Sequence, residues 1–159
     1  MSSSRDDKYA IHAAAREGKL SVFESLLNDD SGWTPLMIAA SVKDGDALVE
    51  LLLSRGADVN HKNQNGQTAL HFVASKNNLE VARKLFAAKP PASARVRDKR
   101  GQYPLHRAAA VGSVPMVKLL LEHNSPLNAT DNAGYTALHH AVAEGHGIST
   151  ELSKSFLGH

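Results

Sequence analysis

The chain has 159 residues, of which 42% are hydrophobic and 5% aromatic, and it carries a formal net charge of +2. This apolar content is typical of a folded domain, and the dominance of Ala and Leu over aromatic residues favours packed helices over a β-sandwich. The absence of cysteine excludes disulfides, thiolate nucleophiles and cysteine-based zinc sites.

Residues 1–8 are expected to be a flexible N-terminus, because they are rich in serine and charge. They lack the apolar core of a secretory signal, and no apolar run in the chain approaches the roughly 20 residues that span a bilayer. We therefore expect a soluble intracellular protein with no membrane partner.

One seven-residue element recurs five times along the rest of the chain. Its central apolar residues are separated by 25, 34, 35 and 33 residues, and they are Ile11, Leu36, Leu70, Leu105 and Leu138. In each unit a Thr or Tyr followed by Pro or Ala opens a first helix. A Gly or Asn then ends it, at Gly18, Asn77, Gly112 and Gly145. A second, Leu-rich helix and a turn of the form Asp/Asn-x-x-Gly complete the unit.

These spacings predict a single domain over residues 9–159. Its repeats are expected at 9–30, 31–64, 65–99, 100–132 and 133–159.

The first unit is eight residues short, so it is either a compact cap or a unit that has lost a segment, and we favour the loss. The last unit replaces its Leu-rich helix with a Ser-rich segment that keeps an i, i+4, i+8 stripe of Ile148, Leu152 and Phe156. Either a terminal cap or a replaced end explains that segment.

The histidines are the residues that could most readily suggest a metal-binding or catalytic site. His12, His71, His106 and His139 occupy the same slot of four repeats. Repeat-related residues are spaced along a stack and cannot converge on one metal ion, so we interpret them as polar braces between a helix start and a hairpin. Side chains of His139 and His140 diverge on a helix, so no metal site is expected with His146 either.

No nucleotide-binding or nucleophile motif is present, so we expect no enzyme activity and no cofactor. The basic segment from Lys89 to Arg107 contains only one aromatic residue, Tyr103. Without a stacking platform or a recognition helix, we expect no nucleic-acid binding.

The recurring element is close to the pattern T-P-L-H-x-A-A, and on this basis the chain is identified as a member of the ankyrin-repeat superfamily over residues 9 to about 146. The resemblance implies an all-α solenoid of about five helix-turn-helix repeats with β-hairpin or loop fingers. A narrower resemblance, to gankyrin-type assembly chaperones of the proteasome regulatory particle, rests on residues 32–41, 63–82 and 106–110.

That resemblance implies a monomeric protein-binding scaffold of the cytoplasm and nucleus. Its partner would be the C-terminal domain of a proteasomal ATPase subunit, held along the concave face. The alternative is a general ankyrin adaptor for a signalling or transcription protein. The gankyrin-type family has more repeats than this sequence shows, and the short first unit and altered end are where it departs.

The contact residues implied by the resemblance lie at the finger tips and at the exposed ends of the first helices. They are Arg16, Glu17, Trp33, Ser41, Val42, Gln64, Asn65, Gln67, Ser75, Lys76, Lys99, Arg100, Gln102, Ala110, Asn132, Tyr135 and Glu144. Trp33 and Tyr135 either pack against the neighbouring hairpin or act as aromatic anchors for the partner.

Charge is distributed unevenly along the array. Residues 1–54 hold five Lys/Arg against nine Asp/Glu, residues 55–125 hold twelve against four, and residues 126–159 hold one against three. An acidic start followed by a basic middle gives the surface a directional field, which predicts a partner of the opposite polarity.

Overall fold

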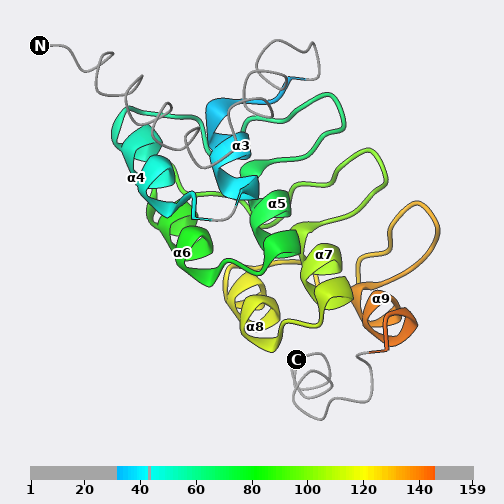
Figure 1. The fold of residues 1–159 in the computed structure, drawn as a ribbon. Helices are drawn as coiled ribbons and strands as arrows, with labels where there is room; N and C mark the ends of the chain where they lie inside the picture. The colour runs from blue at the N-terminus through cyan, green and yellow to red at the C-terminus, as the bar shows by residue number, and fades with distance from the viewer. Residues whose placement is uncertain (1–31, 43, 146–159) are drawn as a thin grey trace, which may run out of the picture.

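The computed structural model describes residues 32–42 and 44–145, which form the expected all-α stack of helix pairs (Figure 1). The first helices of the repeats form an inner layer, made of α3 (Pro35–Ser41), α5 (Ala69–Lys76), α7 (Pro104–Val111) and α9 (Ala137–Ala143). The second helices form an outer layer, made of α4 (Asp46–Ser54), α6 (Leu79–Ala87) and α8 (Val114–Glu122).

The ends of the inner helices follow the predicted local chemistry. The hydroxyl of Thr34 accepts a hydrogen bond from the Met37 N–H at 3.2 Å, and proline occupies the first turn of α3 and of α7. Asn77 and Gly112 end α5 and α7 in the left-handed conformation, with φ of 56° and 83°. The predicted stops at these two positions are therefore confirmed, whereas Gly18 lies outside the described residues.

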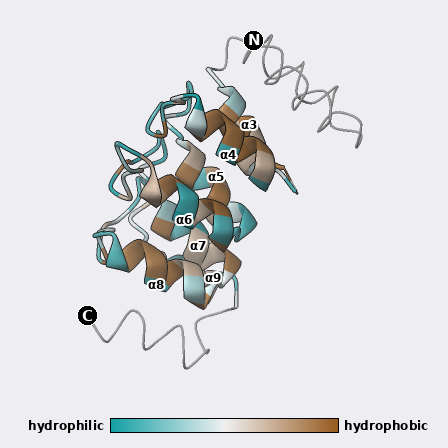
Figure 2. Cartoon of the chain, turned by 90° about the vertical axis from the view of Figure 1, so that its left-hand side faces the viewer, coloured by the Kyte–Doolittle hydropathy of each residue, from teal (hydrophilic) through white to brown (hydrophobic). Residues whose placement is uncertain are grey.

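Small side chains hold the inner layer together. Each inner helix packs against the next, α3 on α5, α5 on α7 and α7 on α9. Ala39, Ala74 and Ala109, from three successive inner helices, are at most 1% exposed. Because alanine adds so little bulk, neighbouring helices approach closely while leucines fill the space toward the outer layer. The apolar colouring of Figure 2 accordingly concentrates on the helices, and the connections between repeats are mainly hydrophilic.

Long connections leave each outer helix and return to the next inner helix as fingers (Figure 1). We call residues 55–68, 88–103 and 123–136 the first, second and third finger. They project on the side of the inner layer, away from α4, α6 and α8. In the described part of the chain the fingers are loops closed by tight turns, and no strand is assigned to them.

Several expectations fall on residues that the structure does not describe. The short first unit at 9–30 and the stripe of Ile148, Leu152 and Phe156 lie outside the described residues. None of the helices in residues 32–42 and 44–145 combines the length and apolarity that a bilayer crossing requires.

The turn glycine of the first finger provides a test of how closely successive fingers approach. Gly66 has φ of 74°, and a Cβ atom there would lie 3.2 Å from the Asp98 Cα and the Lys99 N of the second finger. Gly134 has φ of 86° in the third finger, with nothing described within 4 Å of such a Cβ. Gly134→Ala should therefore lower the free energy of unfolding by about 1 kcal/mol, from backbone strain alone. Gly66→Ala should lower it by about 2–3 kcal/mol, because backbone of the next finger must also move.

Urea denaturation of both variants measures this difference. Equal losses of stability would contradict the close packing of the first and second fingers.

Candidate functional site

Each finger tip is built around one side-chain oxygen that accepts two backbone hydrogen bonds. The Oδ1 atoms of Asn63, Asp98 and Asp131 accept from the N–H groups two and four residues later, at 2.9–3.0 Å. This is the Asx-type turn that the Asp/Asn-x-x-Gly pattern predicts. The three residues are themselves buried, so the turn fixes the backbone while neighbouring side chains point outward.

Successive fingers are also tied to one another. The Lys99 N–H donates to the Asn65 carbonyl at 2.9 Å, and the Asn132 N–H donates to the Arg100 carbonyl at 2.8 Å. The Asn132 side-chain amide donates to the Lys99 carbonyl at 2.7 Å. Because these bonds join one tip to the next, the three tips form one continuous strip. We call this strip, residues 63–67, 98–102 and 131–135, the finger strip.

Buried histidines connect two of the inner helices to fingers: His71 connects α5 to the second finger, and His106 connects α7 to the third finger. The Nδ1 atom of His71 accepts the Thr68 N–H at 3.1 Å at the start of α5, and its Nε2 lies 3.0 Å from the Gln102 carbonyl oxygen in the second finger. His106 repeats this arrangement with the Tyr103 N–H at 3.0 Å and with the Ala129 and Tyr135 carbonyls at 3.1 and 3.2 Å. The predicted brace between helix start and hairpin is thus confirmed for both rings.

This geometry requires a neutral imidazole with its proton on Nε2. Nδ1 accepts a backbone N–H and Nε2 faces carbonyl oxygens, so each ring accepts on one side and donates on the other. Burial lowers the pKa of His71 and of His106 below the ordinary value of 6.5, and this effect exceeds the opposing influence of the carbonyl bonds.

His139 of α9 makes only the first half of the brace. Its Nδ1 accepts the Thr136 N–H at 3.0 Å. The side chain is exposed, and no carbonyl partner for its Nε2 is found within the described ranges.

Asp131 is the centre of a polar cluster below the third finger tip. Its Oδ2 lies 2.7 Å from the His140 Nε2 and 3.3 Å from the Gln102 side-chain amide. Burial opposes its ionisation, but hydrogen bonds from the Tyr135 N–H, His140 and Gln102 outweigh this and lower its pKa to about 2. The carboxylate therefore stays ionised at all ordinary pH values. In the described part of the chain no three His, Cys, Asp or Glu side chains are placed to hold a metal ion.

Four of the predicted contact residues line a polar groove between the first and second fingers. The groove has a volume of about 280 Å³ and is lined by Asn65, Gln67, Asp98, Lys99, Arg100 and Arg107. Arg107 reaches it from α7, with its Nε donating to the Ser75 Oγ at 2.9 Å. The contact residues predicted from the sequence did not include Arg107. The sequence did contain a signal for it, because Arg107 directly follows the repeated histidine, at the position that Phe72 and His140 occupy in the adjacent repeats.

A second polar groove lies at the far ends of α3 and α5. It has a volume of about 440 Å³ and is lined by Ser41, Val42, Asp44, Asp46, Lys76, Asn77 and Asn78. It brings together Ser41, Val42 and Lys76 from the prediction. It adds the carboxylates of Asp44, in the connection to α4, and Asp46, at the start of α4. Among the described residues, Asp44 and Asp46 lie in the second repeat, and Lys99, Arg100 and Arg107 lie at the groove of the second finger. The other acidic residues of the predicted acidic start, apart from Glu50, precede residue 32 and lie outside the described residues.

The two aromatic candidates behave differently. Trp33 is half-buried and packs on Phe72 of α5, with ring centroids 4.3 Å apart. Tyr135 is 53% exposed at the third finger, close to the rings of His139 and His140. The structure therefore gives Trp33 a packing role and leaves Tyr135 accessible.

The remaining predicted residues are placed as follows. Gln102 is buried, with its amide on Asp131, so it offers no side chain at the surface. Ala110 lies partly exposed near the end of α7, and the exposed residues are Gln64, Asn132 and Glu144. Arg16 and Glu17 lie outside the described residues.

A stack of helix pairs joined by projecting fingers is the architecture of ankyrin repeats. A family model described as ankyrin repeats (3 copies) matches residues 2–63, 39–92 and 70–155. The chain belongs to the ankyrin-repeat family.

The curated proteins similar to this ankyrin chain are diverse. The probable 26S proteasome regulatory subunit p28 of Saccharomyces cerevisiae is 44% identical over 127 residues, which cover 78% of this chain and 54% of p28. The E3 ubiquitin-protein ligase KEG of Arabidopsis thaliana is 40% identical over 115 residues, covering 69% of this chain and 7% of that protein. This chain therefore spans about half the length of p28 and a small part of the ligase.

The brace predicts unequal effects for the same substitution in two repeats. His71→Ala leaves the buried Thr68 N–H without a partner, removes one of the two hydrogen bonds to the Gln102 carbonyl and leaves a cavity. It should therefore lower the free energy of unfolding by about 2–4 kcal/mol at pH 7.5. His139→Ala removes only an exposed cap bond and should cost less than about 1 kcal/mol. Chemical denaturation compares the two variants, and a loss at His139 as large as that at His71 would be inconsistent with the brace.

The lowered pKa values predict a loss of stability in mild acid. Below pH 6.5 the unfolded chain binds protons at His71 and His106 that the folded chain resists, so folding weakens as pH falls from 6.5 toward the folded pKa values. The slope is at most about 1.4 kcal/mol per pH unit for each ring. The stabilisation from the lowered pKa of Asp131 is complete above its ordinary value of 3.8 and is lost only as pH falls from there toward about 2, so it is constant in this window.

Urea unfolding at pH 7.5, 6.5 and 5.5 measures the slope. His71→Gln should reduce it, and His61→Gln, which removes an exposed imidazole, serves as the matched control. Equal slopes in His71→Gln and the unaltered chain would contradict the contribution of the buried ring.

Proposed function

We propose that this protein binds one extended face of another polypeptide along the finger strip and the adjoining ends of the inner helices. The observation that carries the proposal is the chain of hydrogen bonds from tip to tip. It uses the backbone groups of Asn65, Lys99 and Arg100 within the array, and their side chains stay exposed at the groove between the first and second fingers. A surface that is ordered before binding loses less entropy when a partner docks.

The partner that this proposal names is the C-terminal domain of a proteasomal ATPase subunit, and the role is that of an assembly chaperone of the regulatory particle. The similarity to p28, whose name places it in the 26S proteasome, supports this assignment. The narrower resemblance of residues 32–41, 63–82 and 106–110 supports it as well. In this proposal the protein acts as a monomer without a catalytic centre, in the cytoplasm and nucleus.

The second candidate is a general ankyrin adaptor for a signalling or transcription protein. The match to a short part of a plant ubiquitin ligase favours it, since the same helix pairs occur there within a different kind of protein. This candidate uses the same finger strip and differs only in the partner.

Capture of separate ATPase C-terminal domains by the immobilised full chain distinguishes the two candidates. The chaperone role predicts strong enrichment of one domain over the others at moderate salt. Equal, weak retention of every domain would reject it, and affinity purification from the native cell would then identify the adaptor's partner.

Charge at the tip of the second finger, residues 98–102, should control the strength of that capture. Lys99→Glu with Arg100→Glu reverses two exposed charges on the finger strip, and should weaken binding of the selected domain by about tenfold or more at low salt, mainly through slower association. The control is Arg83→Glu with Lys89→Glu, which makes the same change of charge on α6 and the loop after it. Surface plasmon resonance at two salt concentrations measures both, and equal weakening would mean that net charge, not the finger strip, governs binding.

A further inference from the structure

The first finger lacks the histidine brace that fixes the other two. The slot that holds His71 in α5 and His106 in α7 is filled in α3 by Met37, which is as deeply buried, at 1% exposed. His71 reaches the carbonyl of Gln102, which directly precedes the N-cap residue of the next inner helix, and the equivalent carbonyl of the first finger is that of Gln67. The thioether of Met37 has no proton to donate to it. This slot therefore gives the first finger no anchoring hydrogen bond.

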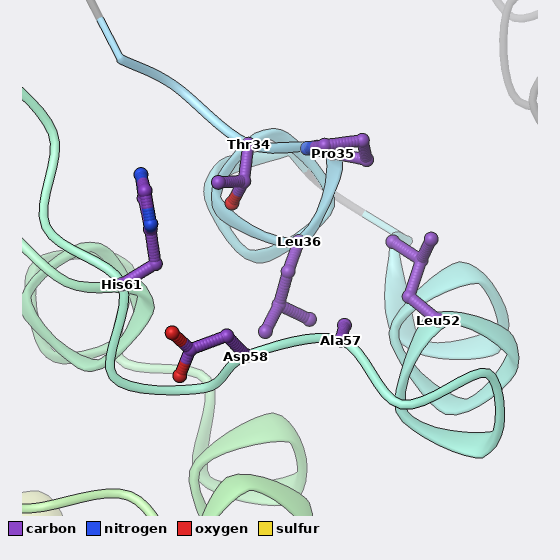
Figure 3. Close-up of a pocket in the computed structure, with 7 residues that line it drawn as sticks. All are labelled: Thr34, Pro35, Leu36, Leu52, Ala57, Asp58 and His61. Carbon is purple, nitrogen blue, oxygen red and sulfur yellow. The ribbon is translucent and has the colours of Figure 1, made fainter.

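The first finger also borders a cavity beside α3. The cavity has a volume of about 240 Å³ and lies between the first turn of α3, Leu52 of α4 and the finger residues Ala57, Asp58 and His61 (Figure 3). A finger that lacks the brace and borders a cavity has fewer contacts to break when it moves. Its local opening therefore costs less free energy than that of the second finger.

The tip of this finger carries an asparagine followed by a glycine, Asn65-Gly66. Asn65 is exposed, and its side-chain amide has no hydrogen-bond partner among residues 32–42 and 44–145. The amides of Asn63 and Asn132, by contrast, donate to the Gln67 side chain and to a backbone carbonyl of the second finger. Glycine has no Cβ atom to shield its backbone nitrogen. The unbonded amide of Asn65 therefore lies next to the least hindered nitrogen that a peptide chain can offer.

We propose that Asn65 is a site of spontaneous deamidation, which proceeds when the first finger opens locally. The Gly66 backbone nitrogen attacks the Asn65 Cγ and forms a five-membered succinimide ring, and the side-chain nitrogen leaves as ammonia with the proton that the Gly66 nitrogen gives up. Water then adds to one of the two ring carbonyls. Breaking one ring C–N bond gives aspartate, and breaking the other gives isoaspartate. Water is the co-reactant, and no atom is oxidised or reduced.

Two hydrogen bonds explain why opening must precede this reaction. The Gly66 N–H donates to the Asn63 carbonyl at 3.0 Å, and the Asn65 carbonyl accepts the Lys99 N–H at 2.9 Å. The first bond occupies the attacking nitrogen, and the second holds the backbone of Asn65 against the next finger. Both must break before the side chain and the nitrogen can close a ring, so the rate follows the free energy of opening.

The product changes the charge of the groove between the first and second fingers. Asn65 lines that groove together with Asp98, Lys99, Arg100 and Arg107. Deamidation adds a second carboxylate to a groove that otherwise holds one carboxylate and three cations, and isoaspartate also lengthens the backbone of the tip by one carbon. An effect on partner capture rests on the proposed function, whereas the chemical step does not depend on it.

Peptide mapping by mass spectrometry, after incubation of the full chain at mildly alkaline pH, tests the proposal. Asn65 should convert to aspartate and isoaspartate at least about tenfold faster than Asn63 and Asn132, whose amides are held and whose following residues carry side chains. Asn65→Gln should abolish the products at this position. No conversion at Asn65, or equal conversion at Asn63, would overturn the assignment of the site.

Substitution of Met37 tests the role of the missing brace. Met37→His supplies an N–H for the Gln67 carbonyl, and should slow conversion of Asn65 by about fivefold, because opening must then break one more hydrogen bond. Met37→Leu is the matched control, since it keeps an apolar side chain without a donor and should leave the rate unchanged. Conversion at the unaltered rate in a folded Met37→His variant would overturn the link between the brace and the reaction.

Hydrogen exchange of the unaltered chain decides the same point without any substitution. Residues 63–67 should exchange about fivefold faster than residues 98–102, which form the equivalent tip of the braced second finger. Equal or slower exchange at the first tip would contradict the easier opening of the first finger.

Discussion

The array depends on two buried neutral imidazoles, one between α5 and the second finger and the other between α7 and the third finger. His71 binds the first turn of α5 through one nitrogen and the second finger through the other, and His106 does the same one repeat later. The ring is rigid, so the direction of the finger is fixed relative to the helix that precedes it. Protonation would place a donor against the Thr68 N–H, and burial opposes it. The same property therefore sets the geometry of the fold and its tolerance of acid.

The finger strip follows from this constraint. Once the bases of the second and third fingers are fixed, the Asx turns and the bonds between tips satisfy the polar backbone groups inside the array. Side chains such as Lys99 and Arg100 are then not needed for folding and can be chosen for a partner. Gly66 shows the limit of that freedom, because a Cβ atom there would push against the backbone of the second finger. The exposed side chains at the tips are thus available for binding a partner, whereas the residues that set the distance between tips, such as Gly66 and the Asx-turn residues, are small or polar.

The sequence predicts the stack well because its period records contacts that every repeat makes. Such contacts are made within one repeat or between equivalent positions of two neighbouring repeats. They explain the helix ends at Asn77 and Gly112, the repeated histidine and the alanines of the inner layer. The sequence predicts the orientation of individual surface side chains less well, because each orientation depends on a contact with a residue that differs from one repeat to the next. Gln102 turns inward because Asp131, 29 residues later, accepts its amide. Arg107 enters the groove because Ser75 of the preceding helix accepts from it. Trp33 is half-buried because its ring packs on Phe72 of the next repeat.

Nearest-neighbour contacts also explain why identical slots have different properties along the array. Leu105 and His106 have a repeat on each side and are buried, whereas Leu138 and His139 have a described repeat on one side only. In a solenoid each repeat is stabilised by its own packing and by its interfaces, so a central repeat gains from two interfaces and a terminal one from fewer. The finger with the basic pair Lys99 and Arg100 is bonded to a finger on both sides, at Asn65 and at Asn132. Lys99 and Arg100, the basic pair of the strip, therefore lie on a backbone that is hydrogen-bonded to both neighbouring fingers. Because these charges are held in fixed positions, less entropy is lost when a partner of opposite charge is attracted and docks.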